Sequence, residues 1–138
     1  MAVLAAHVLV AVLGLGSIAS VAVVAATARR AGRAATEVSA WLEPLLCYSV
    51  FSLAAMLITG ILLDLAAGGA FHRTWWFRIS ALLLVATGAL HAQARGAVRK
   101  GLAKENRGEA VLLRVEHIAY GMCALIASIT VLMEVKPF

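Results

Sequence analysis

The sequence predicts an all-α protein, an antiparallel bundle of four helices that is integral to a membrane. Hydrophobic residues make up 63% of the 138 residues and charged residues only 14%, whereas soluble domains carry roughly a quarter charged residues. The apolar residues fall into four runs, each long enough to cross a bilayer, which takes about 20 residues. No run alternates as a membrane β-strand does, and helices satisfy every backbone group in lipid.

The first expected span covers residues 3–28. It is too long for a secretory signal peptide and has no basic stretch before it. The second expected span covers residues 45–67. Pro44 lies in its first turn, where the missing N–H is tolerated. Asp64 and a following pair of glycines end this helix.

The third expected span covers residues 75–98 and begins with Trp75 and Trp76, which are typical of a membrane–water interface. The fourth expected span covers residues 110–135. Short segments join the four helices, so neighbours along the chain are expected to pack antiparallel in a single domain over residues 1–138.

Basic residues predict the orientation. Nine of the 12 Lys and Arg residues lie in or beside the expected loops 29–43 and 95–110. Because cytoplasmic loops carry the excess of basic residues, both loops are predicted to be cytoplasmic and both termini outside the cytoplasmic membrane. This topology also explains the net charge of +5, so we expect the lipid bilayer as partner and no nucleic acid. The many small residues leave a homo-oligomer open.

The two cysteines, Cys47 and Cys123, stand alone in apolar segments at different expected depths. A disulfide between them is therefore not expected, and both fit the role of small apolar side chains.

Two histidines are each flanked by a glycine and an arginine one helical turn away. The sets are Gly88, His91 and Arg95 in the third span, and Arg114, His117 and Gly121 in the fourth. Both histidines lie about seven residues from the inner ends of their spans, and each set forms one stripe on its helix. If the stripes face each other, two imidazoles bind a haem b iron, the glycines leave room for the ring, and the arginines pair with the propionates.

Two other interpretations of this pair remain open. Each histidine can simply hydrogen-bond a backbone carbonyl, with the arginines at an ordinary inner interface. In the second interpretation the two histidines bind a metal ion or form a proton relay. Glu116 and Cys47 are the nearby candidates for further metal ligands.

A second group of polar residues is expected near the outer surface: His7, Asp64, His72, Arg78 and Glu134. Ionisable side chains inside a membrane are costly and invite a functional hypothesis. We expect Arg78 to pair with an acid, either Asp64 or Glu134. The group is then an interfacial ion network, or an outward-facing ligand or metal site that includes His7.

Several segments give the chain a resemblance to HemJ-type protoporphyrinogen oxidases and CopD-type copper-resistance proteins. They are "AAHVLVAVLG", "LITGILL", "TWWFRISALLLVATGALHAQ", "KENRGEAVLLR" and the C-terminal "VLMEVKPF". The resemblance implies a helical membrane bundle and, for HemJ-like proteins, haem b and oxidation of a porphyrinogen. His7 matches the first-helix histidine of that family. Arg78 stands where the family has a lysine.

Three functions follow as expectations. The leading one is a small haem-b-binding membrane protein that transfers electrons or, as a HemJ-like oxidoreductase, takes part in a porphyrin-linked oxidation, with a redox partner or a porphyrin as its counterpart. The second is copper or small-solute handling of the CopD type, centred on His7. The third is a non-catalytic membrane subunit whose polar residues fix helix packing.

Overall fold

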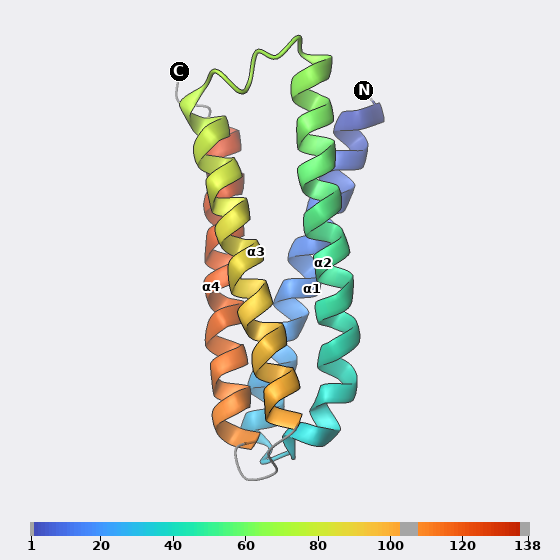
Figure 1. The fold of residues 1–138 in the computed structure, drawn as a ribbon, viewed down its shortest axis with the longest axis vertical. Helices are drawn as coiled ribbons and strands as arrows, with labels where there is room; N and C mark the ends of the chain where they lie inside the picture. Colours follow the sequence, from blue (N-terminus) through green and yellow to red (C-terminus); the bar gives the residue numbers. More distant parts are fainter. Residues whose placement is uncertain (1, 103–107, 136–138) are drawn as a thin grey trace.

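The computed structural model describes residues 2–102 and 108–135, which form a bundle of four helices (Figure 1). The helices are α1 (Ala2–Arg30), α2 (Ala35–Ala66), α3 (Trp75–Leu102) and α4 (Gly108–Val135). Consecutive helices run antiparallel, and all four are long and apolar enough to span a membrane. The predicted all-α four-helix class is confirmed.

The helices are arranged in a ring, in which each packs mainly against its two neighbours. The α1–α2 and α3–α4 pairs pack most closely, and α2 and α3 pack least closely of the four neighbouring pairs. We call the end with residues 31–34 the turn end and the end with residues 67–74 the loop end. Helix α1 begins and α4 finishes at the loop end (Figure 1). That the loop end faces outward stays a prediction.

The helices extend beyond the expected spans, α2 and α3 by a turn or more. Helix α2 begins at Ala35 rather than near residue 45, so the expectation of Pro44 in its first turn is wrong and the expected loop 29–43 shrinks to a turn. Helix α3 continues to Leu102 and α4 begins at Gly108. The expected loop 95–110 is therefore helical wherever it is described, and residues 103–107 lie outside the described residues.

The helices are longer than the expected spans because an apolar run marks only the part of a helix that lies within hydrocarbon. The first turns of α2 continue with one buried face, which includes Val38 and Leu42, while Trp41 is exposed. Pro44 lies on the exposed side of this helix. Its ring removes one intrahelical hydrogen bond without entering the core.

The core is closed most tightly toward the turn end. Small residues of α1, among them Ala22 and Ala25, are almost fully buried against larger apolar residues of the other helices. Farther along α1, a Cβ atom built on Gly14 comes to 3.3 Å from the Cβ of Ser52, so glycine permits the close approach of α1 and α2. Small residues at helix contacts serve this purpose in membranes.

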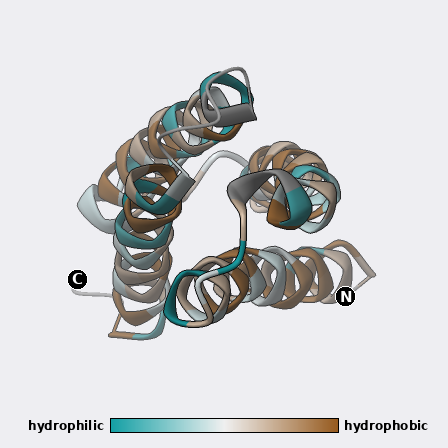
Figure 2. Ribbon diagram, turned by 90° about the horizontal axis from the view of Figure 1, so that it is seen from below, coloured by the Kyte–Doolittle hydropathy of each residue, from teal (hydrophilic) through white to brown (hydrophobic). Residues whose placement is uncertain are grey.

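Large apolar side chains also cover the outside of the bundle. Val12, Phe51, Leu82 and Val131 are each at least 60% exposed. Viewed from below, hydrophobic residues run along all four helices (Figure 2). An apolar exterior of this extent needs an apolar surrounding, so the protein is an integral membrane protein.

The contact at Gly14 leads to a prediction with a matched control. Gly14→Leu should force α1 and α2 apart and destabilise the protein by roughly 1–3 kcal/mol, as overpacking does. Gly16→Leu should be neutral or stabilise by up to about 1 kcal/mol, because a Cβ at Gly16 meets no atom within 4 Å. Thermal unfolding in one detergent measures both. Equal effects of the two substitutions would contradict the close approach.

Candidate functional site

His91 is 3% exposed and anchored to α2. Its Nε2 atom lies 2.8 Å from the carbonyl oxygen of Leu46 and 2.7 Å from the hydroxyl of Ser49. A carbonyl only accepts, so Nε2 carries the proton and donates it. Within the described residues Nδ1 has no hydrogen-bond partner, so a lone pair remains open on this atom.

A groove between α2 and α3, with a volume of about 400 Å³, contains His91 in its wall. We call it the α2–α3 groove. Its other lining residues are Val50, Leu53, Gly88, Ala92, Arg95, Gly96 and Arg99. The predicted stripe of Gly88, His91 and Arg95 therefore does line one space, and the stripe continues for another turn to Gly96 and Arg99. Neither glycine has any atom within 4 Å of a built Cβ.

The stripe of α4 lies elsewhere. His117 is exposed, and its Nδ1 donates to the carbonyl oxygen of Leu113 at 2.8 Å, one turn back in the same helix. Arg114 is exposed as well. Gly121 faces Leu90 of α3, with 3.6 Å between its built Cβ and the leucine Cδ1. His117 does not line the α2–α3 groove, so the structure does not bring the two predicted axial imidazoles into one space.

Glu116, a candidate further ligand beside His117, forms an ion pair instead. Its Oε2 atom accepts a hydrogen bond of 2.8 Å from Nε of Arg29. The carboxylate is 8% exposed and the guanidinium side chain 26%. This pair ties α1 to α4 near the turn end. The other candidate, Cys47, is half-buried and free, and so is Cys123. This agrees with the prediction that the two cysteines form no disulfide.

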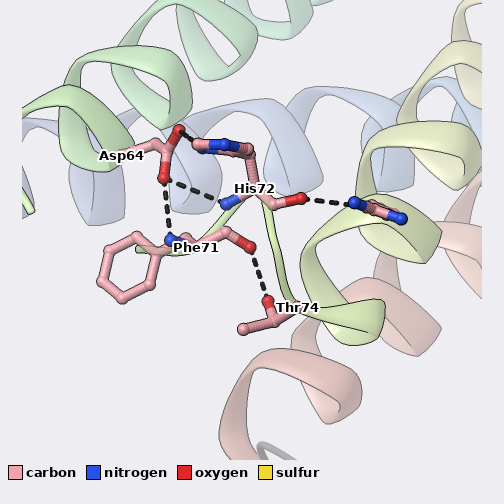
Figure 3. A network of polar contacts seen from close by, with 5 residues as sticks. Asp64, Phe71, His72 and Thr74 are labelled. Atoms are coloured by element: carbon pink, nitrogen blue, oxygen red, sulfur yellow. Dashed lines mark hydrogen bonds and ion pairs between the residues drawn. The ribbon is translucent and has the colours of Figure 1, made fainter. Parts of the chain in front are cut away.

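At the loop end, Asp64 organises the connection between α2 and α3 (Figure 3). Its Oδ1 accepts from the backbone N–H groups of Phe71 at 2.8 Å and His72 at 3.0 Å, and its Oδ2 lies 3.0 Å from Nδ1 of His72. Gly68 and Gly69 have positive φ angles of 66° and 75°, which glycine adopts without strain. Asp64 thus holds the loop to the end of α2, and the predicted ending of this helix is confirmed.

Arg78 belongs to the same network, but the prediction that it pairs with Asp64 or Glu134 is wrong. Its Nε donates to the backbone carbonyl of His72 at 2.9 Å, and its guanidinium lies 5.9 Å from the ring centre of Trp75. Asp64 is already occupied by the loop, and Glu134 is exposed. The carbonyl and the aromatic face are the partners left for an exposed arginine at this position.

His7 stands apart from this network. Its Nδ1 lies 2.8 Å from the hydroxyl of Thr59 on α2, and its ring lines a cavity of about 290 Å³ within the loop-end half of the bundle. We call this space the loop-end cavity. All four helices contribute to its wall, and the side chains are mostly apolar. Ser80 of α3 also lines it.

Four residues of these sites were not singled out from the sequence. Arg99 could have been found by extending the His91 stripe one more turn. Ser49 and Thr59 give no such signal, because which residue faces a histidine on another helix depends on helix rotation. Ser80 lies in an ordinary apolar stretch, and only its buried position makes it notable.

No group of three or more His, Cys, Asp or Glu side chains in the described part of the chain is placed to hold a metal ion. The residues predicted as an outer metal site are divided between a loop network, the loop-end cavity and the exposed surface.

Comparison with protein-family models, characterised proteins and solved structures finds no match for this chain. The class of protein is therefore defined by its fold as a four-span membrane protein, and the resemblance to HemJ-type and CopD-type proteins stays a prediction.

The Asp64 network gives a direct prediction. Asp64→Ala should speed hydrogen exchange at the amides of Phe71 and His72 several-fold, because both lose their acceptor. Exchange measured by mass spectrometry across residues 66–75 tests this. Glu134→Ala, which removes an exposed carboxylate, serves as the control. Unchanged exchange in Asp64→Ala would show that the loop is held by other contacts.

Proposed function

We propose that this membrane protein binds an amphipathic anion in the α2–α3 groove. The observation that carries the proposal is that apolar residues and two arginines line the same groove. Val50 and Leu53 suit a hydrocarbon body, and Arg95 and Arg99 suit carboxylates or a phosphate, which guanidinium groups bind through paired hydrogen bonds. The open space over Gly88 and Gly96 leaves room for a ligand against the helix backbone.

Haem b is the ligand of this class that we propose first. Its propionates suit Arg95 and Arg99, and Nδ1 of His91 is the ring nitrogen that would be left for iron, because Nε2 is held by α2. Histidines that ligate a metal commonly donate their other N–H to a backbone carbonyl, as Nε2 of His91 does to Leu46. Bound haem would supply one-electron chemistry, with a redox partner or a porphyrin as counterpart.

The donor set fits a haem held by one histidine of the chain. It does not fit a haem between His91 and His117 of the same chain, because His117 is exposed on α4 and lines no part of the groove. An anionic phospholipid shares the required chemistry, with its phosphate at the arginines and an acyl chain along Val50 and Leu53.

Purification in mild detergent, after expression with ample haem, separates these sources. A Soret band that shifts on reduction with dithionite identifies haem, and its loss in His91→Phe but not in His7→Ala assigns it to the groove. Native mass spectrometry identifies a bound phospholipid by its mass. We expect one of the two in the wild-type protein.

Groove-filling variants test the site itself. Gly96→Leu should lower occupancy by at least about tenfold, as should Arg99→Gln, since a charge-assisted hydrogen bond contributes roughly 1.5–3 kcal/mol. Gly16→Leu is the matched control, because its Cβ also meets no atom within 4 Å but lies on α1. Full occupancy in Gly96→Leu would contradict the proposal. A wild-type protein without haem or lipid would favour a non-catalytic subunit.

A further inference from the structure

The loop-end cavity has the shape and lining of a small-molecule site separate from the α2–α3 groove. Its volume is about 290 Å³, whereas an apolar cavity of about 150 Å³ in another protein already takes benzene. Phe77, Met56 and Met133 are among its lining residues. Thioether sulfur and aromatic edges make favourable contacts with aromatic rings, so the wall suits a ring better than a polar body.

His7 lines this cavity and has one ring nitrogen left to accept a hydrogen bond. The hydroxyl of Thr59 donates to the carbonyl oxygen of Ala55 at 2.8 Å, so its oxygen accepts from Nδ1 of His7. The neutral ring then has an unprotonated Nε2. Among residues 2–102 and 108–135 this nitrogen has no hydrogen-bond partner.

Ser80 lies in the same wall and has a hydroxyl that is covered but unpaired. The residue is 3% exposed, and its hydroxyl is a fully buried side-chain group without a hydrogen-bond partner in the described chain. Other serines in these helices donate to carbonyls of the preceding turn, as Ser17 and Ser128 do at 2.8 and 2.9 Å. An unpaired hydroxyl in an apolar interior is unfavourable, and a ligand oxygen in the cavity would satisfy it.

We propose that the loop-end cavity binds a hydroxylated aromatic molecule of the phenol or quinol class. The ligand hydroxyl donates to Nε2 of His7, a ligand oxygen accepts from the hydroxyl of Ser80, and the ring lies among the methionines and Phe77. A ligand with only acceptor groups leaves Nε2 of His7 unpaired and binds less well. This site is independent of the anion proposed for the α2–α3 groove, because the two spaces share no lining residue.

The test compares 4-propylphenol with propylbenzene, which has the same body without the hydroxyl. Isothermal titration calorimetry in detergent, corrected by titration into empty micelles, measures both dissociation constants. The phenol should bind at least about tenfold more tightly, as expected for one hydrogen bond to a buried partner. Equal affinities, or no binding of either compound, would overturn the proposal.

Ser80→Ala separates a ligand role from a structural one. Removing the unpaired hydroxyl should raise the thermal stability of the ligand-free protein and weaken 4-propylphenol about tenfold, while propylbenzene affinity stays unchanged. Ser128→Ala, which alters an exposed serine outside the cavity, should change neither affinity. His7→Phe should weaken the binding of 4-propylphenol in the same way. If His7→Phe does not fold, the Ser80→Ala result decides. Unchanged phenol affinity in Ser80→Ala contradicts the proposal.

Discussion

The structure depends on one constraint: a polar group within hydrocarbon must find its partner inside the protein. Most intramembrane polar side chains obey it by reaching another helix or the adjoining loop. His91 reaches the backbone of α2, His7 reaches Thr59, and Glu116 reaches Arg29 of α1. These contacts determine which helix faces meet, because a helix that is apolar on every side packs almost equally well in many rotations. The few groups left without a partner in the described chain, above all the Ser80 hydroxyl, are exceptions to this constraint and are therefore candidates for contact with a ligand.

Packing density is divided unevenly along the bundle. Alanines of α1 allow close contact toward the turn end, where the buried apolar cluster joins all four helices. Toward the loop end, longer side chains such as Met56 and Met133 surround the loop-end cavity. The α2–α3 groove lies along the least closely packed pair of neighbours. The groove thus lies where contact between neighbouring helices is weakest, and the cavity lies outside the buried apolar cluster of the turn end.

The sequence predicts much of the fold, since four apolar runs need four helices in lipid. It does not predict helix ends, because hydropathy falls at the interface while the helix continues, as from Ala35 to Pro44. Spacing correctly places Gly88, His91 and Arg95 on one stripe. It cannot tell that this stripe faces α2 rather than α4, because helix rotation is set by contacts between segments far apart in the chain. Arg78 shows the same limit: its charge is evident, but its backbone partner depends on how the loop folds.

Helix α2 links the two proposed sites. It anchors both histidines, through Leu46 and Ser49 for His91 and through Thr59 for His7, and its residues line both spaces. In each case one ring nitrogen is fixed by α2 and the other is left open, so the rotation of α2 sets the direction of both imidazoles. That rotation is constrained by the close approach of Gly14 to Ser52, which lies between the two anchors along α2. The small residues of α1 therefore act beyond packing, because they orient the side chains on which the binding proposed for both sites depends.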